Sequence, residues 1–124
     1  MTDKPQAENV LGTPLQIHSI HQMTGFYRDG YCRTEATDMG RHVVAAIVTR
    51  EFLDFTHAQG NDLETPRPEY DFAGLQPGDR WCLCARRWKE AEQAVVAPPV
   101  ILNNTHKRAL EDIPLETLKR YQIQ

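Results

Sequence analysis

GLQPGDRWCLCARRW, residues 74–88, decides the fold of this chain, because it joins a turn to a strand that carries two thiols. Pro77 and Gly78 predict the turn, since proline fixes φ and glycine tolerates φ > 0. Residues 80–85 then read as a strand, in which alternate side chains share a face. We expect an apolar face of Trp81, Leu83 and Ala85, and an opposite face of Arg80, Cys82, Cys84 and Arg86.

The two thiols of this strand allow two interpretations. Cys82 and Cys84 would lie about 7 Å apart between their Cα atoms, with an arginine on either side. A cation near a thiol favours the thiolate, which is the nucleophilic form that an enzyme or redox protein would use. Free cysteine is also among the most buried residue types and often serves as a small apolar side chain. Packing is the commoner role, because reactivity requires exposure as well as cations.

Length and composition limit the class of protein. The chain has 124 residues, a net charge of −3 and three cysteines. This length is typical of one domain and can bury a core without a metal or a disulfide. Three cysteines do not make a disulfide scaffold, so a reducing compartment, the cytoplasm, is expected.

Charge and hydropathy exclude two kinds of partner. Acidic and basic residues are interspersed without a basic stripe, so no nucleic acid is expected. No apolar run approaches the length of a membrane span, and the polar start MTDKPQAEN lacks the apolar segment of a signal peptide. We therefore expect no membrane association.

Residues 42–49, HVVAAIVT, give the clearest strand signal. They are apolar on both faces and rich in β-branched residues, which predicts an interior strand next to the one at 80–85. Thr49 is typical of an N-cap, and a helix over 50–59 follows, with Gly60 just beyond its end. Earlier in the chain, Asp29 and Gly30 predict a hairpin of type I′ with arms at 26–27 and 31–32.

The remaining pattern predicts further helices and one further strand. Trp88, Ala91 and Val95 share a helical face over 87–94, and Pro98 ends that helix. The sequence then predicts a strand at 100–103, a helix from an Asn104 or Thr105 cap through Asp112 with Lys107 paired to Glu111, and a last helix after Pro114.

The order of elements predicts the α+β class: a single two-layer domain at 10–124, with a mixed sheet, helices mainly on one face and a long ordered loop, after a flexible tail at 1–9. Residues 61–79 form that loop, since they have no period but carry apolar side chains that need a surface. We expect the loop to fold back over the face with Cys82 and to form a groove there. Asp62 or Asp79 would then pair with Arg28, Arg80 or Arg86, and a guanidinium left unpaired would mark an anion site.

Several motifs together resemble the mainly bacterial family known as domain of unknown function 2237. They are NVLGTPLQ at 9–16, TGFYRDG at 24–30, GNDLETP at 60–66, FAGLQPGDRWCLCARRWKEA at 72–91 and THKRAL at 105–110. The resemblance implies a compact α+β domain and no particular activity.

The cysteine and histidine positions follow this family in part. Cys32, Cys82, Cys84, His42 and His106 match its pattern. His18 and Tyr31 stand where the resemblance implies cysteines, and Ala45 stands where a third is common. A histidine at 18 could keep a metal ligand, but the other two replacements could not, which weakens any interpretation that needs the full set.

Zinc binding is the metal hypothesis that these residues permit. Cys32, Cys82, Cys84 and one histidine from His18, His42 or His106 could supply four ligands. One residue between two cysteines is tighter than the usual spacing, so neither zinc nor another cofactor is expected. His42 is more typical of a structural histidine, and His106, near a helix N-terminus, should have a lowered pKa.

Two functions remain open. The first is a domain that binds a small anionic ligand or a protein partner in the groove beside the DRWCLC strand. The second is a thiol-dependent enzyme or redox protein that uses Cys82 or Cys84. The oligomeric state is left open. The candidate site residues are Arg28, Asp29, Cys32, His42, Asn61, Asp62, Asp79, Arg80, Cys82, Cys84, Arg86 and His106.

Overall fold

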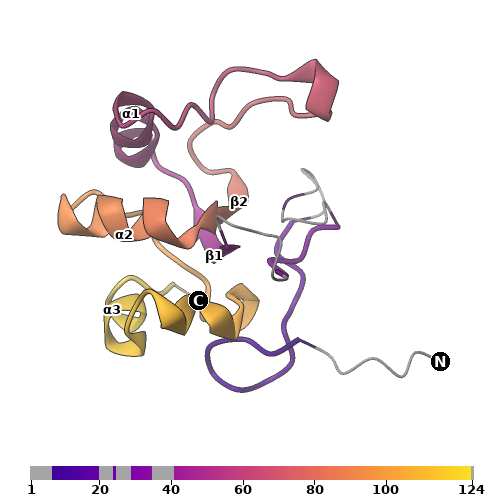
Figure 1. Ribbon diagram of the computed structural model, residues 1–124, viewed down its shortest axis with the longest axis vertical. Coiled ribbons are helices and arrows are strands. Elements are labelled where there is room, and N and C mark those ends of the chain that lie inside the picture. The colour runs from indigo at the N-terminus through magenta and orange to yellow at the C-terminus, as the bar shows by residue number, and fades with distance from the viewer. Residues whose placement is uncertain (1–6, 20–23, 25–28, 35–40, 124) are drawn as a thin grey trace.

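The structure is a computed structural model that describes residues 7–19, 24, 29–34 and 41–123 (Figure 1). The elements in chain order are β1 (His42–Ile47), α1 (Arg50–Ala58), the 3-10 helix η1 (Pro68–Tyr70), β2 (Arg80–Cys84), α2 (Ala85–Gln93), the 3-10 helices η2 (Leu102–Asn104) and η3 (Lys107–Glu111), and α3 (Leu115–Arg120). The predicted α+β class is confirmed.

The sheet consists of β1 and β2, which pair antiparallel with Ala45 opposite Cys82. The other edge of β1 bonds to the chain around residues 99–106. The Ile47 N–H donates to the Pro99 carbonyl (3.0 Å), and the Ala45 carbonyl accepts from the Ile101 N–H (2.9 Å). β1 is therefore interior and lies next to β2, as predicted.

The third strand predicted at 100–103 is reduced to one residue. Val100 bridges Ala46 in the antiparallel sense and Gln122 in the parallel sense. η2 begins at Leu102, so the chain turns before a longer ladder can form. Among the described residues, the parallel pairing expected of a mixed sheet is limited to the bridge between Val100 and Gln122.

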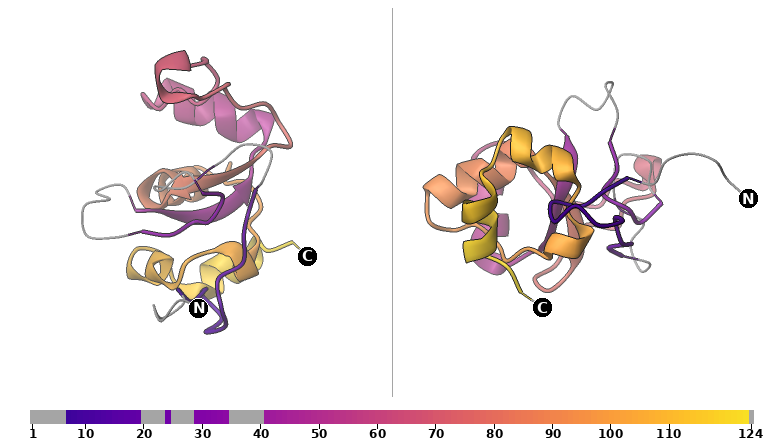
Figure 2. Two further views of the ribbon diagram at one scale, coloured as in Figure 1. Left: turned by 90° about the vertical axis from the view of Figure 1, so that its right-hand side faces the viewer. Right: turned by 90° about the horizontal axis from the view of Figure 1, so that it is seen from below.

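All three α-helices pack on one face of the sheet, as predicted (Figure 2). Ala46, Trp81 and Leu83 point into the main core, where they meet Phe52 of α1 and Trp88 of α2. The indole N–H of Trp88 donates to the Pro98 carbonyl at 3.1 Å, so its one polar group is satisfied inside the core. Ala45 and Cys82 point to the opposite face.

α1 follows the sequence signals closely. The Thr49 hydroxyl accepts a hydrogen bond from the Phe52 N–H at 3.1 Å, which is the expected N-cap. Gly60 has φ +95° directly after the C-cap Gln59, as a glycine in that position should.

α2 begins two residues earlier than predicted, because the chain passes from Cys84 directly into the helix at Ala85. Arg86 consequently lies on α2 and not on the strand face that carries Cys82. Val95 was predicted to face inward, but it lies beyond the helix and is 82% exposed. The capping residue of η3 is His106, not Asn104 or Thr105.

The N-terminal segment covers the face of the sheet that the helices leave open (Figures 1 and 2). Asn9 is fully buried there, and its side-chain N–H groups donate to the Asn103 carbonyl (3.0 Å) and the Thr13 hydroxyl (2.8 Å). Ala7 and Glu8, which precede Asn9 in the predicted tail, are also bonded to the fold, since their carbonyls accept from the Leu15 N–H and the Lys107 N–H, each at 2.9 Å. Residues 1–6 lie outside the described residues.

The type I′ hairpin predicted at Asp29 and Gly30 lies partly outside the described residues, which begin again at Asp29. Gly30 has φ +88°, and the Asp29 carboxylate accepts from the Tyr31 N–H at 3.1 Å. A Cβ on Gly30 would meet the Ser19 carbonyl oxygen at 2.4 Å, so this position requires glycine for space as well as for conformation. The predicted arm at 26–27 lies outside the described residues.

The loop at 61–79 is ordered but lies on the other face from the one predicted. Its stem is closed by a bond from the Leu75 N–H to the Leu63 carbonyl at 2.8 Å. Phe72 packs on Trp81 with 5.1 Å between ring centroids, inside the main core. The loop therefore covers the Trp81 face of β2, and the groove predicted beside Cys82 is not formed by it.

Candidate functional site

A disulfide joins Cys32 to Cys82 on the sheet face opposite the main core. Their Cα atoms lie 5.3 Å apart, and 50 residues separate them in sequence. Both residues are buried, and with Ala45 they form a small apolar cluster of their own. This bond was not predicted, because three cysteines argue against a disulfide framework. Three cysteines still allow one bond and one free thiol, and that is the arrangement observed.

Short hydrogen bonds fix the N-terminal segment beside the disulfide. The Cys82 N–H donates to the buried Thr24 hydroxyl at 2.7 Å. The Gly30 N–H donates to the Thr24 carbonyl at 3.0 Å, and the Gly30 carbonyl accepts from the His18 N–H at 2.7 Å. The segment that carries Cys32 is thus attached to β2 by polar contacts as well as by the covalent bond.

His18 is a buried part of this same segment. Its Nε2 donates to the Ala46 carbonyl at 2.9 Å, and its Nδ1 accepts from the side-chain amide of Asn104 at 3.1 Å. These two contacts define one neutral tautomer. Burial lowers the pKa of His18 to about 4, with the nearby Arg80 charge acting in the same direction. Because both ring nitrogens are engaged, His18 is not free to bind the metal for which it was considered.

Cys84, the third cysteine, is a free and half-buried thiol at the end of β2. It shares a strand face with Cys82, two residues away, and is paired with His42 across the sheet. The Arg41 carbonyl accepts from the Ala85 N–H at 3.1 Å and from the Val43 N–H at 2.8 Å. Arg41, His42 and Cys84 are therefore neighbours at one end of the strand pair.

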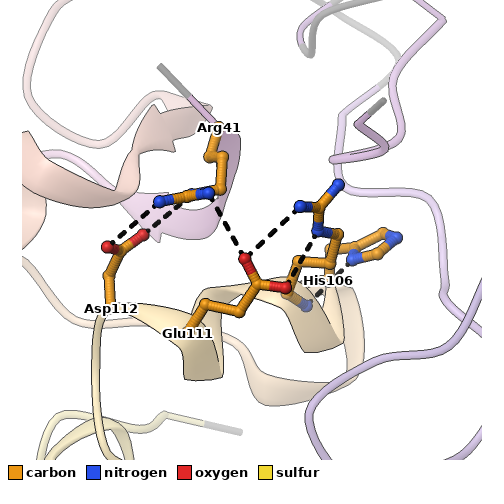
Figure 3. A network of polar contacts seen from close by, with 5 residues as sticks. Arg41, His106, Glu111 and Asp112 are labelled. Atoms are coloured by element: carbon orange, nitrogen blue, oxygen red, sulfur yellow. Dashed lines mark hydrogen bonds and ion pairs between the residues drawn. The ribbon is translucent and has the colours of Figure 1, made fainter. Parts of the chain in front are cut away.

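Arg41 is held in place by two acidic residues (Figure 3). Its Nε donates to Asp112 Oδ2 at 3.0 Å and its Nη1 to Glu111 Oε1 at 3.3 Å. Glu111 also accepts from the guanidinium of Arg108, at 3.2 Å and 3.3 Å. The pKa of Arg41 is raised, mainly by its hydrogen bond to Asp112. Sequence reasoning missed Arg41, whose φ of 49° is unusual for a residue other than glycine.

His106 lies at the other edge of β1 from Cys84, where its N–H donates to the Val43 carbonyl at 3.0 Å. Its Nδ1 accepts from the Arg108 N–H at 3.0 Å and caps η3 (Figure 3). The predicted lowering of its pKa is confirmed in direction, but burial is the main cause, followed by the charges of Arg108 and Lys107. The predicted pairing of Lys107 with Glu111 is wrong, because the Lys107 ammonium contacts Glu8 at 3.4 Å.

The polar residues predicted in the loop serve as turn residues. The Asn61 side chain donates to the Thr56 hydroxyl at 3.0 Å. Asp62 accepts from two backbone N–H groups, and its pKa is lowered to about 2, mainly by a hydrogen bond to the Thr65 side chain. Asp79 accepts from the Gln76 N–H at 2.9 Å. None of these contacts brings the loop to Cys82 or Cys84.

The charged residues predicted around the groove are dispersed. Asp29 pairs with Arg33 in its own turn, and Arg28 lies outside the described residues. Arg80 and Arg86 are exposed, and Arg80 donates to the His18 carbonyl at 3.3 Å. Of the twelve predicted site residues, the structure brings together Cys32, Cys82, Cys84 and His42.

Within the described residues, no three histidine, cysteine or acidic side chains are grouped so that they could hold a metal ion. The disulfide also occupies two of the three thiols considered for zinc. We still expect the purified protein to contain no stoichiometric zinc, and elemental analysis would check this prediction.

The fold and site define a small α+β domain with a buried disulfide and a half-buried thiol on one face of a two-stranded sheet. The chain belongs to the family of uncharacterised proteins conserved in bacteria, domain of unknown function 2237, which matches residues 8–122. No curated protein matches the chain. Among the described residues, no helix has the length and apolar character needed to cross a membrane.

Proposed function

We propose that this protein is a thiol–disulfide redox protein whose working pair is Cys32 and Cys82. The observation that carries the proposal is the disulfide itself, placed two residues from the free and half-buried Cys84 on the same strand face. Reduction would convert the bond to two thiols by taking up two electrons and two protons from a dithiol. The alternative function needed a ligand-binding groove beside Cys82. The loop that was expected to form this groove lies on the other face of β2.

The position of the bond supports reversibility. The main core, which contains Trp88, Phe52 and Leu83, lies on the opposite face of the sheet and does not include the disulfide. A purely structural disulfide is typical of a small domain that cannot build a sufficient core. This chain does build such a core, on the other face of the sheet. Breaking the bond would loosen the attachment of the N-terminal segment and leave the helical layer intact.

The compartment bears on the same question. Disulfides persist in oxidising compartments, whereas cytosolic disulfides are usually transient and serve catalysis or redox sensing. If the protein is cytoplasmic, as the sequence predicts, the Cys32 to Cys82 bond is expected to open and close with the redox state of the cell.

The number of reactive thiols measures this directly. We expect one thiol per denatured chain after equilibration with excess oxidised dithiothreitol, and three after equilibration with excess reduced dithiothreitol, because this cyclic reagent leaves no lasting mixed disulfide on Cys84. A smooth, reversible transition between these limits is expected as the ratio is varied.

The variant Cys32→Ser serves as the matched control for this titration. It should show no transition assignable to the Cys32 to Cys82 pair. If wild type showed one thiol per chain at every ratio of oxidised to reduced reagent, the bond would be permanent. If it showed three thiols at every ratio, the bond would not form. Either result would contradict the proposed function.

A further inference from the structure

We infer that Cys84 is the exchange thiol of this protein. It displaces Cys82 from the bond with Cys32, so that the disulfide joins Cys32 to Cys84, where an outside dithiol can reach it. This inference rests on the proposed function, and its test is designed to fail separately from it.

The burial of the disulfide creates the need for such a thiol. Cys32 is 0% exposed and Cys82 is 1% exposed, so neither sulfur is open to a reductant in solution. Thiol–disulfide exchange requires the attacking thiolate to reach a sulfur of the bond. Cys84 is the one cysteine of the chain that is both free and partly open to solvent, and it lies on the same strand face.

Strand geometry selects Cys32 as the sulfur that is attacked. Residues i and i+2 of a strand are about 6.6 Å apart with parallel side chains. A disulfide needs Cβ atoms at about 3.5–4.5 Å, so a bond between Cys82 and Cys84 is disfavoured while β2 persists. Cys32 comes from outside the sheet, just after the Gly30 turn, so it can shift along β2 from one partner to the other.

The exchange step conserves electrons. The Cys84 thiolate attacks the Cys32 sulfur, a Cys32 to Cys84 bond forms, and Cys82 leaves as a thiolate. Cys84 has lost its proton to water, and Cys82 takes one up. An external dithiol then attacks the Cys84 sulfur, which breaks the Cys32 to Cys84 bond, releases Cys32 as a thiolate and leaves a mixed disulfide on Cys84. The second thiol of the reagent attacks its own sulfur in that mixed disulfide and releases Cys84, so the reagent leaves as a disulfide and the protein ends with three thiols. The dithiol supplies the two electrons and two protons.

The rate of reduction tests the role of Cys84. With dithiothreitol as the probe, we expect the oxidised variant Cys84→Ser to be reduced at least about tenfold more slowly than wild type, because access controls the exchange rate. Its equilibrium thiol count should still change by two, which keeps the proposed function intact. Equal rates would overturn the exchange role, whereas the absence of any thiol change in wild type would instead overturn the proposed function.

A second variant traps the rearranged bond. Oxidised Cys82→Ser should contain no free thiol, and trypsin should release residues 29–33 linked to residues 81–86. Two free thiols in the folded, oxidised variant would show that Cys32 cannot reach Cys84 and would exclude the proposed rearrangement.

Discussion

Replacing Cys32 by serine is expected to lower the free energy of unfolding of the oxidised protein by about 4 kcal/mol. The bond closes a long stretch of chain, since its two cysteines are 50 residues apart. Such a cross-link reduces the conformational freedom of the unfolded chain, and the effect grows slowly with loop length. Urea denaturation followed by circular dichroism gives the difference directly.

Two comparisons separate the bond from other effects of the substitution. Wild type in excess dithiothreitol should lose nearly the same stability, whereas Cys84→Ser should stay within about 0.5 kcal/mol of wild type in the oxidised state. A loss below about 1 kcal/mol in both Cys32→Ser and reduced wild type would contradict a bond that constrains the unfolded chain.

The elements that the sequence predicted well are those with local signals. β1 is a continuous apolar run with β-branched residues, and α1 has a threonine cap and a terminal glycine within one short window. The pairing of β1 with β2 was predicted because β1 is apolar on both faces, which indicates an interior strand with neighbours on both sides. Backbone propensity and burial act over a few residues in these cases, and a sequence displays them directly.

The disulfide could not be predicted from such signals. It depends on where the N-terminal segment crosses the sheet, which is set by the Gly30 and Thr24 contacts and by the buried Asn9 side chain. None of these residues has a periodic pattern. The pairing of Cys32 with Cys82 is therefore a consequence of tertiary packing, and spacing alone does not report it.

The predicted groove failed for a related reason. Apolar residues in the loop showed that it needed a surface, but both faces of β2 offer one. Phe72 and Leu75 pack on the face that carries Trp81, where both residues join the main core and Phe72 also contacts the Trp81 ring. Arg41 was missed because its partners Asp112 and Glu111 are distant in the sequence.

The buried histidine of the N-terminal segment carries the second large prediction. His18 is 2% exposed and neutral in the folded protein, with its Nε2 proton donated to Ala46 and its Nδ1 lone pair accepting from Asn104. Protonation would place a second donor against the Asn104 amide and leave a charge away from water. Its pKa is about 4 in the fold, against an ordinary value of 6.5.

The sign of the pH effect follows from this difference. Between pH 6.5 and 4 the unfolded chain binds a proton at His18 and the folded chain does not, so acid favours unfolding. Stability from this residue is complete above the unfolded pKa and is lost as the pH falls toward the folded pKa. The loss amounts to about 3 kcal/mol in total.

We therefore expect the free energy of unfolding of oxidised wild type to fall by about 3 kcal/mol more than that of His18→Gln between pH 7 and pH 4. Glutamine retains an amide donor for the Ala46 carbonyl but has no proton to gain, and His106 and the carboxylates titrate alike in both proteins. Urea denaturation at closely spaced pH values measures the difference. Parallel profiles for the two proteins would show that His18 accepts a proton in the fold as readily as in the unfolded chain. The neutral ring that holds the N-terminal segment against β1 would then be the wrong description of this site.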